Sequence, residues 1–343
     1  MRTPTLHLLG GAFTLLLCLA VPVLGQDEPL QAFRDGDALT LVPVDDSARI
    51  ELPGGRALSV ALPERAEVSA FAAIDGGWVA AGSVPAATGG RKLFLLRGND
   101  NASRPMAEPP GQDGKQRRGP VLLVDGGRLA GIAWLEGDGD RSLSVRASLW
   151  NGKRWQAPER VSFPGPGTQI ALTGAVLADA SWLLAWSAFD GQDDEIVWAR
   201  RAGNSWQPVK RLAAGNSVPD ITPALTATAD GGALIAWSRF EGTGYQMRMA
   251  RFGRDGWKDE HSAAALGSLY PTFLGPSRLL YLDAAAPRSW TVLDLDAQGR
   301  VRAKASAPST LERPAVAFEG NQVRMRWPAA KRQATAPLEK AVP

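Results

Sequence analysis

Two groups of acidic residues stand out as candidates for metal or ligand chemistry. In the first group, Glu136, Asp138 and Asp140 alternate with glycine in one loop. Carboxylate oxygens are the ligands that a hard cation such as Ca²⁺ prefers, so these three residues are candidate calcium ligands. The loop lacks the later bidentate glutamate of an EF-hand. Aspartate is also common in solvated turns, where it bonds the backbone of the turn itself, and both interpretations stay open at this stage.

The second group comprises Asp190, Asp193, Asp194 and Asp220. The first three lie in one loop, and Asp220 stands at the start of an apolar segment. Loops carried by a rigid scaffold are where binding residues are usually found. The sequence therefore predicts a binding site at these four residues, for a protein or carbohydrate partner.

The rest of the chain lacks residues that many enzymes need. Cys18 is the only cysteine, and His261 is the only histidine after His7. If the N-terminal segment that contains His7 and Cys18 is cleaved off, the remaining chain can form no disulfide and has no cysteine nucleophile. With a single histidine left, it also has no zinc site built on paired histidines. The sequence also has no nucleotide-binding glycine loop and no Gly-x-Ser-x-Gly elbow. We expect no cofactor other than the calcium ion considered above.

The N-terminal segment is typical of a cleaved signal peptide. Arg2 precedes an apolar run over residues 8–24, and Val23 and Gly25 are small residues suited to signal-peptidase cleavage. We predict a signal peptide over residues 1–25 and a mature protein that is periplasmic or secreted, with no membrane span. The alternatives are an uncleaved anchor and a lipoprotein attached through Cys18.

The charge balance of the mature chain argues against one class of partner. Removing Arg2 from the 38 basic residues leaves 37, against 35 acidic residues. A nucleic-acid-binding protein needs clustered positive charge to displace counterions from phosphates. We therefore expect no nucleic-acid partner.

Residues recur at intervals of 51 positions in the middle of the chain. Trp155, Trp206 and Trp257 follow this interval. Three further pairs keep the same register: Trp186 and Trp237, Phe189 and Phe240, and Arg200 and Arg251. A period near 50 with several short strands per unit is typical of a β-propeller. Because recurring residues serve what all units share, we expect the three tryptophans to be buried between neighbouring sheets.

Each unit is predicted to be a four-stranded antiparallel blade. The segments ITPALTATA, ALIAWSRF and YQMRMARF, with a fourth strand from Trp257, illustrate the pattern. About six such units fit between Gln26 and Trp327, so residues 26–328 are predicted to form an all-β propeller of six blades, with seven as the alternative. We expect strands from both ends of the chain to complete one blade together. Residues 329–343, rich in alanine, proline and lysine, are predicted to be a disordered tail.

The units resemble the sialidase-like propellers with Asp-box (BNR) repeats. The box of that family reads Ser-x-Asp-x-Gly-x-x-Trp and lies between the third and fourth strands. Ser148, Gly152 and Trp155 match it, whereas Trp150 occupies the aspartate position. The resemblance implies a propeller fold, and the departure at Trp150 limits what it implies about activity.

A catalytic sialidase binds the carboxylate of its substrate with arginines and uses a tyrosine nucleophile. The resemblance therefore suggests Arg118, Arg313 and Tyr270 as catalytic candidates, because each lies beside a proline or near one at the start of a predicted inner strand. The alternative is that they are ordinary polar residues at strand starts.

The main functional prediction is an exported, non-catalytic propeller that binds or scaffolds a protein or glycan partner. The alternative is a sialidase-like glycoside hydrolase, and an assembly factor in an envelope complex is a third reading. Function is expected where the units differ. We predict the partner site on the face that carries the acidic loops, opposite the Asp-Gly-Gly turns and near the central channel.

Overall fold

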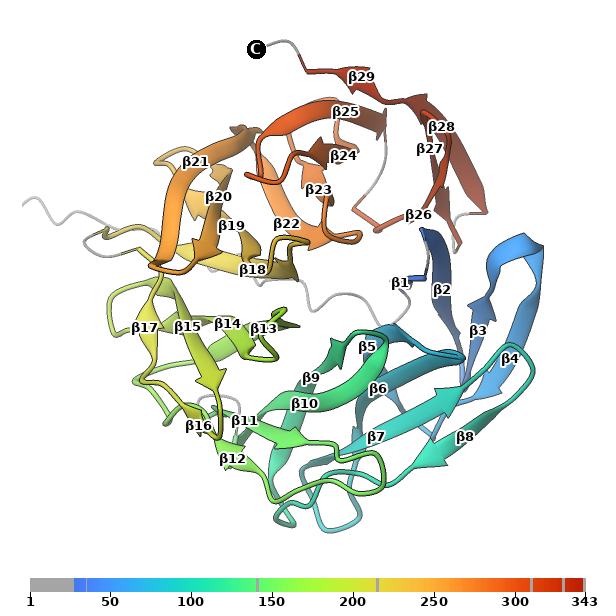
Figure 1. The fold of residues 1–343 in the computed structure, drawn as a ribbon, viewed down its shortest axis with the longest axis vertical. Coiled ribbons are helices and arrows are strands. Elements are labelled where there is room, and N and C mark those ends of the chain that lie inside the picture. Colours follow the sequence, from blue (N-terminus) through green and yellow to red (C-terminus); the bar gives the residue numbers. More distant parts are fainter. Residues whose placement is uncertain are drawn as a thin grey trace, which may run out of the picture.

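The computed structural model describes residues 28–34, 36–139, 142–213, 216–308, 311–328 and 331–341. The predicted signal peptide and its cleavage site lie outside these residues. Seven antiparallel sheets are arranged in a ring (Figure 1), and the first strand of each lies nearest the centre. The protein is therefore a seven-bladed β-propeller. The prediction of six blades was wrong, and the alternative of seven blades is confirmed.

Blades 1 to 3 are formed by the N-terminal half of the chain. Blade 1 contains β1 (Leu30–Arg34), β2 (Asp37–Val44), β3 (Ser47–Glu51) and β4 (Ala57–Ala61), with a 3₁₀ turn at Pro53–Gly55. Blade 2 contains β5 (Glu67–Ile74), β6 (Gly77–Pro85), β7 (Arg91–Gly98) and β8 (Ser103–Met106). Blade 3 contains β9 (Gln116–Asp125), β10 (Arg128–Gly137), β11 (Ser144–Leu149) and β12 (Glu159–Arg160).

Blades 4 to 7 complete the ring. Blade 4 contains β13 (Gln169–Val176), β14 (Trp182–Phe189), β15 (Asp194–Ala202), β16 (Ser205–Trp206) and β17 (Lys210–Arg211). Blade 5 contains β18 (Asp220–Ala227), β19 (Ala233–Phe240), β20 (Tyr245–Gly253) and β21 (Gly256–Leu266). Blade 6 contains β22 (Ser268–Phe273), β23 (Arg278–Asp283), β24 (Ser289–Leu295) and β25 (Val301–Pro308). Blade 7 contains β26 (Ala315–Glu319), β27 (Gln322–Trp327) and β28 (Arg332–Pro337), and β29 (Glu339–Lys340) joins blade 6.

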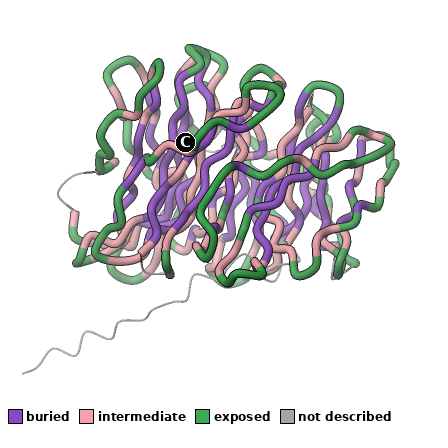
Figure 2. Tube along the Cα trace, turned by 90° about the horizontal axis from the view of Figure 1, so that it is seen from below, coloured by how far each residue is buried: buried purple, intermediate pink, exposed green. Residues whose placement is uncertain are grey.

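The core lies between the blades, because each blade packs its two sides against its neighbours. Six apolar clusters are each shared by two adjacent blades. The second strands, such as β14 and β19, are apolar on both sides and therefore read as continuous hydrophobic runs. Figure 2 shows these buried strands between two faces of exposed loops.

The blade count was wrong because the blades differ in length. β13 begins 51 residues before β18, but β1 begins only 37 residues before β5. Blade 7 is also short, because β26 to β28 make a sheet of three strands. Dividing the chain by the period of its middle blades therefore gives too few blades.

The ring closes without a composite blade, contrary to the prediction. Among the described residues, no strand of blade 1 pairs with a C-terminal strand. Instead, the side chain of Gln31 in β1 donates to the carbonyl of Val316 in β26 and accepts from its amide, both at 2.8 Å. The buried guanidinium of Arg313 donates to the carbonyl of Pro29 at 2.6 Å. Side chains thus join the two ends of the ring.

Residues 331–341 contain two strands, although a disordered tail was predicted over residues 329–343. β28 pairs with β27 along its whole length, and β29 pairs with β25 of the preceding blade. Its alanine-rich and threonine-containing sequence carries little hydrophobic alternation, so its strand character depends on the neighbouring strands.

Candidate functional site

One cross-strand position distinguishes blade 4 from its neighbours. Where the first strand of each blade pairs with the second, blade 3 places Arg117 opposite Glu136 and blade 5 places Asp220 opposite Arg239. Blade 4 places Gln169 opposite Ala188 at the same position. Blade 4 therefore has a small apolar residue where its neighbours have a charged side chain.

In blades 3 and 5, the carboxylate of the charged pair accepts a hydrogen bond from the indole N–H of a buried tryptophan. Glu136 accepts from the indole of Trp134 at 3.1 Å, and Asp220 accepts from the indole of Trp237 at 3.1 Å. Each carboxylate is balanced by arginine: Arg117 and Arg146 lie 3.2 and 3.3 Å from Glu136, and Arg239 makes two bonds to Asp220 at 2.8 and 2.9 Å. The space beside these tryptophans is thus filled by ion pairs.

The equivalent tryptophan of blade 4 lacks this arrangement. Trp186 is fully buried, and its indole N–H has no hydrogen-bond partner among the described residues. Gln169 does not reach it, because its side chain bonds the hydroxyl of Ser162 and the carbonyl of Leu143. Trp186 and Ala188 instead line a pocket of about 680 Å³.

The outer wall of this pocket is open because the outer strand of blade 4 is interrupted. β16 and β17 are separated by residues 207–209, whereas the corresponding β21 of blade 5 runs without a break for 11 residues. Phe163, 72% exposed, and Val209 stand at the rim. The pocket thus combines an exposed aromatic ring with lining residues that include Trp186, Asp190 and Glu195.

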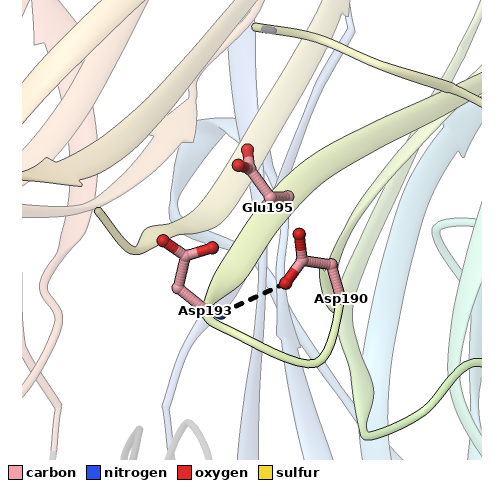
Figure 3. Close-up of side chains that lie close together, drawn as sticks. All are labelled: Asp190, Asp193 and Glu195. Atoms are coloured by element: carbon pink, nitrogen blue, oxygen red, sulfur yellow. Dashed lines mark hydrogen bonds between the residues drawn. The ribbon is translucent and has the colours of Figure 1, made fainter. Parts of the chain in front are cut away.

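Two acidic residues, Asp190 and Glu195, line the pocket, and Asp193 lies close to both. Asp190 and Asp193 belong to the turn between β14 and β15, and Glu195 lies in β15 opposite Ala188. One carboxylate oxygen from each lies within 4.8 Å of the others, and the three side chains surround a common space (Figure 3). Asp190 accepts from the amides of Gln192 and Asp193, which hold its pKa below the usual range.

Glu195 is the least satisfied member of this cluster. It is only 1% exposed, and neither carboxylate oxygen has a hydrogen-bond partner among the described residues. Arg211 Nη1 is 3.8 Å from Glu195 Oε1, beyond hydrogen-bond distance. Burial, together with the negative charges of Asp220 and Asp193, raises the pKa of Glu195 to about 7.

The structure brings together part of the predicted binding group. Asp190 and Asp193 lie side by side with Glu195, and burial raises the pKa of the neighbouring Asp194. Asp220 accepts hydrogen bonds from Trp237 and Arg239, and its negative charge contributes to the raised pKa of Glu195. Asp190 is the member of the predicted group that lines the pocket, and residues 206–209 and Arg211 of the outer strand region form another wall.

The residues first considered as calcium ligands are placed differently. Glu136 is held by Arg117 and Arg146, and Asp138 forms an ion pair with Lys115. Asp140 lies outside the described residues. Within the part of the chain that the structure describes, the acidic group close enough to share an ion is the Asp190 cluster instead.

The three sialidase-type candidates lie in different blades. Arg118 is in β9 of blade 3, where its guanidinium donates to Gln116. Tyr270 is in blade 6, at a bulge in β22 where its φ is +54°. Arg313 is buried between blades 6 and 7, bonded to Pro29 and at 3.5 Å to Thr272. The contacts of Arg313 are those of a ring-closing residue.

Sequence reasoning missed the pocket, although the signal for it was present. When the units are aligned at their 51-residue period, Ala188 is equivalent to Arg239, and the corresponding residue of blade 3 is Glu136. A small residue at a position that is charged in both neighbouring blades indicates a local opening. The burial of Glu195 could not be seen in this way, because it depends on how blade 3 packs against β15.

Comparisons with known proteins support the fold and go no further. The sequence matches no protein-family model and no curated protein. A virginiamycin B lyase from Staphylococcus aureus is similar in structure, with a TM-score of 0.54 at 13% identity over 92% of this chain and 95% of that one. An ulvan lyase bound to -[GlcA(1-4)Rha3S]- has a TM-score of 0.54 at 9% identity, over 92% of both chains. A protein of unknown function from Dyadobacter fermentans has a TM-score of 0.50 at 14% identity, over 81% of this chain and 96% of that one.

These likenesses define the class of protein as a β-propeller, and the Asp-box repeats receive no specific support from them. Among the described residues, no helix is long and apolar enough to cross a bilayer.

Proposed function

We propose that this chain is an exported, non-catalytic binding propeller and that its ligand is a carbohydrate held in the pocket of blade 4. The observation that carries the proposal is the replacement of an ion pair by Ala188. Among the described residues, the indole N–H of Trp186 and both carboxylate oxygens of Glu195 are left without a hydrogen-bond partner, and both residues line the pocket. Export rests on the signal peptide predicted over residues 1–25.

A carbohydrate fits the chemistry of this pocket. A sugar ring presents C–H groups on its faces and hydroxyl groups around its edge, so it needs an apolar platform beside hydrogen-bonding groups. Phe163 offers an exposed ring at the rim, and Trp186 and Glu195 offer a donor and an acceptor inside. Buried polar groups without partners favour a ligand that supplies them.

A flat protein interface fits less well. A stable interface covers about 800 Å² on each partner and has an apolar centre. The large exposed apolar side chains of the described residues are scattered, and those that meet at the pocket are Phe163 and Val209. The exposed apolar surface is thus suited to a small ligand.

One observation favours glycoside hydrolysis as a second candidate function. Oxygens of Asp190 and Glu195 lie within 4.8 Å, near the spacing of about 5 Å that retaining glycosidases use for their two carboxylates. Asp190, however, already accepts hydrogen bonds from two backbone amides and, at 2.7 Å, from Arg211. The binding function is therefore the better supported of the two.

The test fills the pocket without removing any wall residue. Ala188→Arg places a guanidinium at the position of Arg239 in blade 5, opposite Glu195 on the neighbouring strand. A glycan array screened with residues 26–343 identifies a ligand, and calorimetry then measures its affinity. We expect the substitution to weaken binding by roughly 100-fold while the melting temperature changes by less than about 3 °C. Glu241→Arg, in the exposed turn of blade 5, adds the same side chain outside the pocket and is expected to bind normally.

Unchanged glycan binding by the Ala188→Arg variant would contradict the proposal. A screen in which only peptides bind would show that the partner is a protein. Hydrolysis of the bound glycan, abolished by Glu195→Gln, would establish the second candidate function.

A further inference from the structure

We infer that Asp190, Asp193 and Glu195 form a binding site for one divalent cation of the Ca²⁺ type. This site adjoins the pocket of blade 4, but the inference does not depend on the ligand proposed there. It rests on the geometry of the three carboxylates and on the fact that the most buried one has no hydrogen-bond partner in the part of the chain that the structure describes.

The spacing of the three carboxylates suits a single ion. Ca²⁺ binds oxygen ligands at about 2.3–2.6 Å, so two oxygens on opposite sides of one ion are about 4.8 Å apart. The oxygens of Asp190, Asp193 and Glu195 all lie within 4.8 Å of one another. Figure 3 shows the carboxylates arranged around one space, with Glu195 on the side of β15 and the two aspartates on the turn.

Glu195 provides the second observation, because it is buried and aimed into the cluster without a hydrogen-bond partner among the described residues. Both of its oxygens, and Oδ2 of Asp193, are buried with no hydrogen-bond partner among the described residues. A buried carboxylate is costly unless it is paired or coordinates a metal. A cation at the centre of the cluster would supply the missing partner for both residues.

The other buried acids of the ring show what is missing here. Glu136 lies against two arginines, and Asp220 makes two bonds to Arg239. The Asp190 cluster has three carboxylates and one guanidinium, that of Arg211. Arg211 bonds Asp190 and stays 3.8 Å from Glu195, so the cluster keeps an excess of negative charge.

The ligand chemistry selects the type of cation. All three ligands are carboxylates, and water from the open pocket can complete the coordination shell. Oxygen-only sites of flexible geometry favour Ca²⁺, whereas Zn²⁺ is usually bound through nitrogen or sulfur ligands. The side chain of Arg211 is 48% exposed and can move into solvent when the cation binds.

The experiment uses CaCl₂ alone as the probe, without any glycan. Residues 26–343 are treated with EDTA, exchanged into chelator-free buffer and titrated by calorimetry, and the melting temperature is followed in parallel. We expect one Ca²⁺ per chain with a Kd of about 10⁻⁴ to 10⁻³ M, the range typical of extracellular calcium-binding modules. The melting temperature should rise with Ca²⁺ concentration, because the ion binds only the folded chain.

The variants distinguish this site from nonspecific binding of calcium to acids. Glu195→Gln and Asp193→Asn should each weaken binding by at least roughly tenfold, because each removes a charged ligand. Asp138→Asn, in the equivalent turn of blade 3, is the matched control and should bind Ca²⁺ as the wild type does. Arg211→Ala removes the competing cation and should tighten binding severalfold.

The inference is overturned if the wild type shows neither heat nor a thermal shift with Ca²⁺. It is also overturned if both the Glu195→Gln and Asp193→Asn variants bind as the wild type does, or if Asp138→Asn loses binding equally. Because no glycan is present, these outcomes leave the proposed carbohydrate function to its own test.

Discussion

Buried carboxylates in this ring are of two kinds, and the difference between them is local. Glu136 is surrounded by positive charge, with Arg117 and Arg146 on either side and the indole of Trp134 as a donor. Glu195 is just as buried but has no hydrogen-bond partner among the described residues. Breaking a buried ion pair is destabilising, whereas removing an unpaired buried charge is not. The same substitution should therefore have different effects at the two residues.

We expect Glu136→Gln to lower the free energy of unfolding by roughly 3–5 kcal/mol, because it leaves the buried Arg117 without a full counter-charge. Glu195→Gln should leave that free energy unchanged or raise it. Urea denaturation in the presence of EDTA measures both, since the chelator removes any effect of a bound cation. Equal losses for the two variants would show that Glu195 has a stabilising partner.

At the level of strands, the three repeated tryptophans follow the predicted packing only in part. Trp155, Trp206 and Trp257 each join the apolar cluster between their own blade and the preceding one. Trp155 is 6% exposed and its indole donates to the carbonyl of Ala107 at 2.7 Å, whereas the other two are half-buried. The expected burial of all three holds for Trp155 alone.

Truncation of these tryptophans should therefore have graded effects. Trp155→Ala is expected to lower the free energy of unfolding by about 3–5 kcal/mol, the range for a buried aromatic side chain. Trp206→Ala and Trp257→Ala should each cost less, because part of each ring already contacts water. Chemical denaturation of the three variants gives the order, and equal losses would contradict the difference in burial.

The arginines that recur at 51 positions, Arg200 and Arg251, also make contacts that belong to the structure of the blade. Arg200 bonds Asp179 at 2.5 Å, and Arg251 makes the equivalent ion pair with Asp230. In each case a residue of the third strand reaches the turn between the first and second strands. Their recurrence at 51 positions thus reflects a structural contact that two blades share.

For the molecule as a whole, stability depends on how the ring is closed. Blade 7 has three strands, and its third, β28, comes from the segment predicted to be disordered. Ala334, Ala336 and Leu338 of this segment pack on the cluster between blades 6 and 7. β29 then crosses to β25, so the C-terminal segment ties these two blades together.

Shortening the C-terminus in two steps should separate these contributions. Removing residues 329–343 deletes β28 and its apolar contacts, and we expect the melting temperature to fall by roughly 5–10 °C. Removing residues 339–343 deletes only β29, whose residues are exposed, and should lower the melting temperature by about 2 °C or less. Differential scanning calorimetry measures both, and a full-length melting temperature for the longer deletion would contradict the role given to β28.

The repeat made the middle of this fold predictable. The segments ALIAWSRF and YQMRMARF correspond to β19 and β20 almost residue for residue, because apolar runs and glycine turns define strands locally. The number of blades was not predictable from the same period, since blades 1 and 7 are shorter than the blades between them. The strand character of β28 was also missed, because pairing with β27 determines it.

The sequence by itself determined that this protein is a propeller of repeated four-stranded blades and that acidic residues gather in the turn of blade 4. Only the tertiary structure decided that Ala188 opens a pocket beside Trp186 and that Glu195 is buried there with no hydrogen-bond partner in the described parts of the chain. The physical reason is that strand patterns depend on neighbours along the chain. Burial and pairing of a charge depend instead on side chains from other strands and from the adjacent blade, which the order of residues does not place.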